Sequence, residues 1–396
     1  MPGKLTILIG PNGYGKTTRL EEIKKGLATN GKSVFSIPSE ILLLDEIKDT
    51  KDTSQTMEYL LTELIQTPKY EILLDDFFSE VDKTIAHNVS AMNDILDEIL
   101  SMNGSSRTGD FISSNPNKRA VKSLVAINQK DVKNKMGSGQ RMSLLLKLAS
   151  KSTRDYIFLD EPEQYSHPSM LHSTALAIND LVGKGKHVYI ATHSPKLVSM
   201  LDIDYSNIKV INDISHSEKD IPFDYAVSEA SKHFNVNAMK STSKPYYISA
   251  ASLKECIQRR HNRQFIEALF SKRVYLCEGA NDEHLINAAL REHGGYFDDY
   301  VIFKVWGKPN LPVFAYLFNE LSIKTIVLYD KDDVSQPFHK ESNDAINSLP
   351  SSIPSIEQDP NLESELKFLG KKGDALAFMN HLESISIPSK FDLKKY

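Results

Sequence analysis

The sequence of 396 residues contains only two cysteines, Cys256 and Cys277, and no apolar run that approaches the roughly 20 residues needed to span a bilayer. So few thiols indicate a reducing compartment rather than a disulfide framework. The formal net charge of −5 excludes a globally basic nucleic-acid binder but not a local basic groove. The first apolar run, Leu5–Ile9, is too short for a secretory leader. We therefore expect a cytoplasmic protein with no membrane partner.

A glycine-rich loop follows this first predicted strand, and residues 10–18 fit the pattern G-x-x-x-x-G-K-[ST]. Strand, loop and helix in this order predict phosphate binding, because glycines let backbone N–H groups curl around an anion at a helix N-terminus. Lys16 is expected to reach the β- and γ-phosphates of ATP, and Thr17 to hold Mg²⁺. The candidate nucleotide-binding residues of the loop are Asn12, Gly13, Gly15, Lys16, Thr17 and Thr18.

Acidic residues follow a second buried strand, residues 156–159, in the run Asp160-Glu161-Pro162. We expect Asp160 to bind Mg²⁺ through water and Glu161 to orient or deprotonate the attacking water. A further strand, residues 187–192, ends at His193, which is a candidate for contacting the γ-phosphate. A lone histidine is more often structural, but its place after the loop and the acidic pair favours the catalytic role.

A turn of small residues at 136–141 precedes the acidic pair and opens an apolar helix. Its Ser138, Gly139 and Gln140 are candidate nucleotide-binding residues. Gln129, at the end of a predicted strand at 121–127, is a candidate for the glutamine beside the Mg²⁺, although a glutamine there is more often polar surface.

Glu278, Asp330 and Asp332 follow strands in the last third of the chain. The pattern of strand, helix, strand, helix, strand over residues 273–329 predicts a parallel sheet, whose ligand groups collect at the carboxyl ends of the strands. Asp330 and Asp332 are expected to project to one side of an extended chain and to suit Mg²⁺ or Mn²⁺. A second Asp-x-Asp, at residues 202–204, is interpreted as a loop. So many like charges need a cation nearby.

Residues 1–212 resemble the ABC-type ATPases of the SMC, RecF and Rad50 kind. In that family the signature turn of one subunit closes over the γ-phosphate bound to the other, so the resemblance implies a head-to-head homodimer, or a higher homo-oligomer, through the ATPase heads. The sequence departs from the family at Gly137, which occupies the position of the signature serine. Ser138 is expected to supply the hydroxyl. The departure affects the prediction of the ATP hydrolysis rate more than the prediction of nucleotide binding.

The Glu-Gly, apolar strand and Asp-x-Asp set resembles a Toprim domain. An ABC ATPase followed by a Toprim domain is the arrangement of the OLD (overcoming lysogenisation defect) family nucleases, and residues 307–314 also resemble that family. The resemblance implies metal-site roles for Glu278, Asp282, Asp330, Asp332 and Glu363. It also implies a lysine that stabilises transition-state charge, at Lys371 or Lys372, of which Lys372 is taken as the candidate.

The predicted fold class is α/β, with two domains and a connector. We expect an ABC-type P-loop ATPase domain over residues 1–212, with a helical insertion at about 40–120. A connector over residues 213–270 carries a basic helix with Arg259, Arg260, His261 and Arg263, interpreted as a solvated face or as a contact to a nucleic-acid backbone. A Toprim domain occupies residues 271–396.

The combination predicts an ATP-regulated, metal-dependent endonuclease that acts on DNA in defence against phage, with a companion defence protein as a further partner. Two alternatives stay open. One is an RNA-cutting toxin like that of PARIS-type defence systems. The other is a nucleotide-switched nucleic-acid-binding protein that does not cut. The sequence leaves open whether ATP activates or restrains cleavage.

Overall fold

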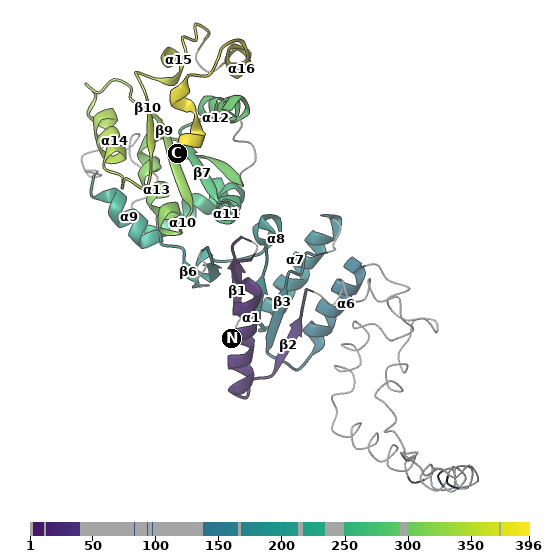
Figure 1. The fold of residues 1–396 in the computed structure, drawn as a ribbon. Helices are drawn as coiled ribbons and strands as arrows, with labels where there is room; N and C mark the ends of the chain where they lie inside the picture. The colour runs from purple at the N-terminus through teal and green to yellow at the C-terminus, as the bar shows by residue number, and fades with distance from the viewer. Residues whose placement is uncertain are drawn as a thin grey trace. The chain divides into compact units, whose positions relative to one another are not determined.

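The computed structural model describes residues 3–11, 13–39, 138–164, 168–212, 217–233, 249–293, 299–371 and 374–396, with single residues at 83, 93 and 97 (Figure 1). At residues 138–141, 168, 169 and 337 only the backbone is described. Contacts divide the chain into two compact units, residues 1–34, 155–163 and 182–396 in one, and 35–154 and 164–181 in the other. This division does not test the predicted domain boundaries, and all but three residues of the predicted insertion lie outside the described ones.

The first sheet contains the predicted phosphate-loop strand and both strands that precede the predicted catalytic groups. Five of its six strands lie in the first unit, in the order β3 (Tyr156–Asp160), β4 (His187–Ala191), β1 (Leu5–Ile9), β5 (Ile208–Val210) and β6 (Lys219–Asp220). Strand β4 pairs in parallel with both β1 and β3. The carboxyl ends of these three strands therefore lie on one rim, where the glycine loop, Asp160 and His193 follow them.

Helix α1 (Lys16–Thr29) packs on this sheet through Leu20, Ile23 and Leu27, which are spaced for one helical face. The second unit contains α6 (Ser138–Lys151) and most of β2 (Val34–Ile37) and α7 (Pro168–Gly183). The predicted apolar helix after the small-residue turn is confirmed, since Met142, Leu145, Leu146 and Ala149 of α6 are buried.

The second sheet has the order β10-β9-β7-β8, and all of its pairs are parallel. Its strands are β7 (Arg273–Cys277), β8 (Tyr300–Lys304), β9 (Lys324–Asp330) and β10 (Ser355–Gln358). The predicted parallel sheet is thus confirmed. The edge strand β10 lies between Pro354 and Pro360, which do not interrupt its parallel pairing with β9.

Helices cover both faces of this sheet, so its strands read as continuous apolar runs. Helices α12 (Ala280–His293) and α16 (Ala375–Ser384) pack over Tyr275 and Cys277. On the opposite face Phe303 lies against Phe314 and Phe318 of α13 (Leu311–Glu320). The remaining helices of this part are α11 (Asn262–Phe270), α14 (Pro337–Asn347) and α15 (Leu362–Glu365).

Segments between the two sheets make specific contacts within the first unit. They include α8 (Pro195–Met200), α9 (Phe223–Ser231) and α10 (Ala250–Cys256), and one π-helical turn (Ile257–His261) joins α10 to α11. The Tyr205 hydroxyl lies 2.7 Å from Asn262 Oδ1, and Asn212 Nδ2 donates to the Leu321 carbonyl at 3.2 Å. Residues that flank β5 of the first sheet are therefore bonded to residues around the second.

A membrane span is not found among the helices of the described ranges, none of which combines the length and the apolar character that crossing a bilayer requires.

Candidate functional site

The glycine loop between β1 and α1 has the geometry that phosphate binding requires. Gly13 and Gly15 both have φ of 84°, in the left-handed region that glycine adopts without steric cost. No side chain caps the start of α1, so its first N–H groups are open to an anion. The Lys16 ammonium is buried and donates to the carbonyls of Gly10, at 2.9 Å, and Pro11, at 3.1 Å. Burial lowers the pKa of Lys16, against the opposing pull of the acids beyond β3.

Thr17 and Asp160 meet across the first sheet, as predicted for groups that share a magnesium ion. The Thr17 hydroxyl lies 3.1 Å from Asp160 Oδ1 and 3.2 Å from Oδ2, and Asp160 is buried. These hard oxygens at the start of α1 fit a nucleotide-bound Mg²⁺. Thr18, one position further along α1, is exposed, and Asn12 lies outside the described residues.

Glu161 and His193 also come together. His193 Nδ1 lies 3.1 Å from Glu161 Oε1, and the Glu161 N–H donates to the carbonyl of Ala191 at 2.8 Å. Glu161 has φ of 47°, an uncommon conformation for a residue with a side chain and one that concentrates at active sites.

Glu163 is a member of this group that sequence reasoning missed. Its Oε1 accepts hydrogen bonds from the Thr192 hydroxyl at 2.5 Å and from the His193 N–H at 3.2 Å. Its Oε2 is buried with no partner among the described residues, and burial raises the pKa of the carboxyl. Glu163 therefore holds the turn that carries His193. The repeated acid in Asp160-Glu161-Pro162-Glu163 was the available signal.

The small-residue turn is described only in part. Ser138, Gly139 and Gln140 form the first turn of α6, with their side chains undescribed, and Gln129 lies outside the described residues. Their contact with nucleotide stays a prediction.

The acids of the second sheet converge on its carboxyl rim. The Asp330 N–H donates to Glu278 Oε1 at 3.2 Å, which brings the end of β9 to the end of β7. Asp282, in the first turn of α12, accepts from the Gly279 N–H at 3.0 Å and from Gln358 Nε2 at 3.3 Å. Asp330 Oδ1 accepts from the Leu362 N–H at 2.9 Å. Three carboxyls thus meet where β7, β9 and β10 end.

Burial and mutual repulsion hold the protons on these carboxyls more tightly than usual. Burial is the largest cause that raises the pKa of Glu278 to about 8, of Asp330 to about 7 and of Asp282 to about 6. The charge of Asp282 raises both other values further, and Lys308 opposes the shift at Glu278. Such a cluster is the electrostatic signature of a site that accepts a cation.

Asp332 lies differently from our expectation. The predicted extended chain through Asp330 and Asp332 is wrong beyond Asp330, because β9 ends there and Asp332 has φ of 55°. Its Oδ2 lies 2.7 Å from the Lys308 ammonium and 3.2 Å from His339 Nδ1. Lys308 is only 2% exposed and also contacts Asn343 Oδ1 at 3.3 Å. This buried cation was missed as a site residue, although its Gly-Lys-Pro-Asn run had marked the segment.

The structure separates the two glutamates that follow β10. Glu363 Oε1 accepts from Asn281 Nδ2 at 3.0 Å, and its charge raises the pKa of both Asp282 and Asp330. Glu365 instead pairs with Lys390 at 2.6 Å. The geometry therefore joins Glu363 to the acids. Lys371 is exposed, and Lys372 lies outside the described residues.

The donor set at this rim fits a hard divalent cation, since carboxylate oxygens are the ligands that Mg²⁺ and Mn²⁺ prefer. As the side chains stand, within the described ranges no group of three or more His, Cys, Asp or Glu residues has the geometry to hold an ion. Several of the carboxylate oxygens are bonded to backbone N–H groups instead. Side-chain rotation within the cluster would release them.

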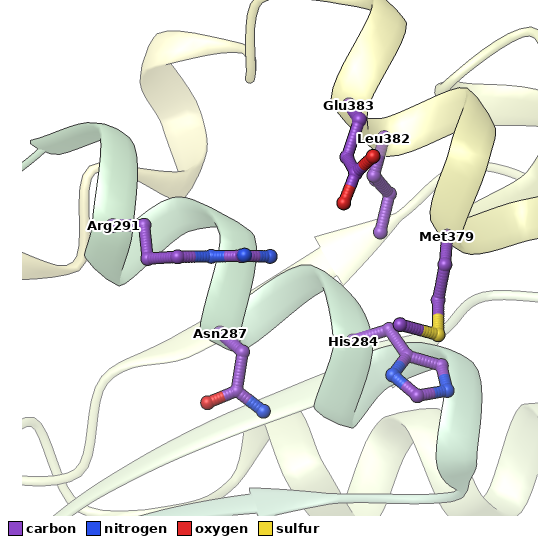
Figure 2. Close-up of a pocket in the computed structure, with 6 residues that line it drawn as sticks. All are labelled: His284, Asn287, Arg291, Met379, Leu382 and Glu383. Carbon is purple, nitrogen blue, oxygen red and sulfur yellow. The ribbon is translucent and has the colours of Figure 1, made fainter.

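A pocket of about 290 Å³ lies between α12 and α16, and Figure 2 shows Arg291 and Glu383 extending into it. Its other lining residues are His284, Asn287, Met379 and Leu382. His284 follows Asp282 by two residues, or about 200° around the helix. The pocket is therefore on the face of α12 that turns away from the acids.

The predicted basic helix is interrupted by the π-helical turn before α11. Arg259 pairs with Glu255 at 2.6 Å and Arg263 with Glu267 at 2.8 Å, and all four side chains are exposed. His261 is buried against Phe303 and Phe314. This geometry fits the solvated face better than a nucleic-acid contact.

Comparisons with known proteins find similarity in the part of the chain that carries the acidic rim. A family model described as "Overcoming lysogenization defect protein-like, TOPRIM domain" matches residues 269–332. The Old nuclease of Escherichia phage P2 is 24% identical over 339 residues, which cover 82% of this chain and 53% of that protein. The chain therefore spans about half the length of this curated relative.

Solved structures show weaker likenesses. Stu0660 of Streptococcus thermophilus is 14% identical, with a TM-score of 0.34 over 65% of this chain and 80% of that one. An archaeal ribosome recycling factor, aABCE1, solved with the stalk protein aP1, is 17% identical, with a TM-score of 0.28 over 53% of this chain and 36% of that one. The Toprim family match includes Glu278, Asp282 and Asp330 of the acidic rim, and the similarity to the Old nuclease extends over most of the chain.

Proposed function

We propose that the protein is an ATP-regulated, divalent-metal-dependent nuclease of OLD type, which acts on DNA in the cytoplasm in defence against phage. One observation carries the proposal. Glu278, Asp282 and Asp330 share the rim of a parallel sheet, with the pKa of each raised by burial and by like charge. Such a set of acids is suited to metal-dependent phosphodiester hydrolysis. The relationship to a nuclease supports it.

In this proposal the ligands of the cluster are Glu278, Asp282, Asp330, Asp332 and Glu363. When bound, Mg²⁺ or Mn²⁺ supplies an activated water and stabilises the leaving oxygen. Lys308 holds the carboxylate of Asp332, so the ligand keeps its orientation as the other acids rotate. Gln358, buried at the end of β10, orients Asp282 in the same way. Lys372 remains the proposed stabiliser of charge on the cleaved phosphate.

The ATPase part of the proposal rests on the first sheet. Lys16, Gly13 and Gly15 bind the phosphates, while Thr17 and Asp160 hold the magnesium that accompanies them. Glu161 positions and deprotonates water, and Glu163 holds the turn of His193. We propose that ATP brings two chains together through the turn at 136–141. In the ABC-type ATPases that residues 1–212 resemble, the corresponding turn of one subunit contacts the γ-phosphate bound to the other. The bonds of Asn212 and Tyr205 near the second sheet support a link between the two activities.

The test is a cleavage assay on the purified protein. Plasmid DNA and total RNA are incubated with Mg²⁺ or Mn²⁺, each with and without ATP. We expect metal-dependent cutting, greater on DNA, whose rate changes when ATP is added. Cutting in the presence of a chelator, or no cutting of either nucleic acid under any condition, contradicts the proposal. Light scattering with ATP bound to the Glu161→Gln variant tests the dimer, and a monomer there contradicts it.

A second candidate is a nucleotide-switched nucleic-acid-binding protein. The observation in its favour is that no three acids within the described ranges are arranged to hold an ion as they stand. It predicts ATP-dependent retention of DNA or RNA without cutting, so the same assay, with binding measured beside cleavage, separates the two functions.

A further inference from the structure

Trp306 is the only tryptophan of the chain, and its indole is 54% exposed. It follows Val305, which is fully buried and continues the register of β8, since its N–H donates to the carbonyl of Cys277 at 3.0 Å. Among the described residues no other ring stacks on the indole. A large aromatic ring that directly follows a fully buried residue is more often covered than left in water, so its exposure calls for a binding partner.

The backbone at Trp306 is held in an unfavourable conformation. Its φ is 52°, in the left-handed region where a bulky side chain is a steric outlier. Asn310 closes the turn around it, because the Asn310 N–H donates to the carbonyl of Gly307 at 3.0 Å and its Nδ2 donates to that of Val305 at 3.2 Å. Strain of this kind persists when the surroundings enforce it, and it concentrates at binding sites. The indole is therefore preorganised.

This turn belongs to the acidic rim. Cys277 of β7 and Lys304 of β8 form the last pair between these two strands, which as neighbours in a sheet lie about 4.8 Å apart. Glu278 is one residue beyond this pair on its strand, and Trp306 is two residues beyond it on the other. Two residues after Trp306, Lys308 binds Asp332 at 2.7 Å. Strand β8 is at the edge of the sheet, so Trp306 lies on the rim that carries the carboxyls, at the side where no further strand is paired in the described residues.

We propose that Trp306 stacks on an unpaired nucleobase next to the phosphate that the acidic rim binds, and that the site acts on single-stranded or locally unpaired nucleic acid. This inference rests on the proposed nuclease function. In a duplex the bases stack on one another and their faces are closed to a side chain. In a single strand each base offers a face to an aromatic ring, with little dependence on sequence. A protruding indole beside a phosphodiester site fits the second substrate class.

The first test uses tryptophan fluorescence, which in this chain reports on Trp306 alone. The Asp330→Asn variant, which binds without cutting, is titrated in Mg²⁺ with single-stranded DNA, single-stranded RNA and a blunt DNA duplex of the same sequence. We expect the single strands to quench the emission and the duplex to leave it nearly unchanged. No quenching by either single strand, or equal quenching by the duplex, overturns the proposal.

The second test removes the ring. Trp306→Gly, with Asp330→Asn, should weaken binding of a labelled single strand about tenfold, as expected from the loss of one base stack. Trp306→Phe should restore most of the affinity, because it keeps a ring. Leu376→Ala, which removes an exposed apolar side chain from α16, is the matched control and should bind normally. Unchanged affinity in Trp306→Gly overturns the proposal.

Activity and stability separate this inference from its alternatives. With Asp330 intact, Trp306→Gly should raise KM for single strands about tenfold and change kcat little. If the parental protein cuts and Trp306→Gly keeps its KM, stacking fails and the nuclease stands. If the parental protein cuts nothing, but single strands still quench Trp306 and Trp306→Gly still weakens their binding, stacking stands and the nuclease fails.

Glycine accepts the backbone conformation of Trp306, so Trp306→Gly should melt at or above the parental temperature. A markedly lower melting temperature, or self-association that Trp306→Gly abolishes, makes the indole a structural or protein contact and overturns the proposal.

Discussion

At the rim of the first sheet, Asp160 and Glu161 each lie against a side chain from another element, Thr17 and His193. At the rim of the second sheet, Glu278, Asp282 and Asp330 face backbone N–H groups and one another. The first arrangement joins unlike groups, as a site for a nucleotide and its magnesium requires. The second concentrates like charges, which need a cation. The contrast predicts that removal of divalent metal affects the second site more than the first.

The largest expected effect is on cleavage. Asp330→Ala removes a proposed metal ligand, so cleavage should fall on the order of a thousandfold or more, while ATP hydrolysis stays near the parental rate. The control is Asp204→Ala in the other Asp-x-Asp, where Asp204 accepts from the Ser206 N–H at 2.8 Å at the start of a short 3₁₀ helix. That variant should cut normally. Equal cutting by Asp330→Ala and the parental protein places the active site elsewhere.

The next effect is confined to the first sheet. Glu161→Gln removes the proposed base and should lower ATP hydrolysis about a hundredfold or more, while Lys16 and Thr17 still bind ATP. Lys16→Ala should lose ATP binding itself, measured by calorimetry. Hydrolysis at the parental rate in Glu161→Gln refutes its role as the base.

A smaller loss of cleavage is expected at Lys308. Lys308→Met leaves Asp332 without its ammonium partner and should lower metal affinity or cleavage about tenfold to a hundredfold. Lys324→Met, at the exposed opposite end of β9, is the control and should have no effect. Metal titrations of cleavage by both variants measure the difference. An unchanged metal dependence in Lys308→Met means that Lys308 does not position a ligand.

The smallest effect is on stability. Without nucleotide, saturating Mg²⁺ or Mn²⁺ should raise the melting temperature by a few degrees, because the ion binds only the folded acids. Asp330→Asn should lose this increase. It should also melt at or above the parental temperature without metal, because it removes a carboxyl whose pKa burial raises to about 7. A metal-dependent increase that persists in Asp330→Asn, measured by calorimetry, assigns the ion to the first sheet instead.

Contiguous patterns in the sequence determined most of the framework. Apolar runs predicted the parallel second sheet and three strands of the first, and the residues that directly follow those runs, such as Asp160, Glu278 and Asp330, lie at the strand ends. The reason is geometric, since a parallel strand carries the residue after it to a known edge of the sheet. The glycine loop could likewise be read because its chemistry lies within nine consecutive residues.

Tertiary structure alone decided which distant groups complete each site. Glu163 reaches the turn of His193, Lys308 reaches Asp332, and Glu363 rather than Glu365 joins the acids, through contacts that no local pattern encodes. The exposure of Trp306 was equally unreadable, because an aromatic residue after an apolar strand predicts burial. Its place in water depends on a strained backbone and on a turn closed by Asn310, which only the folded chain specifies.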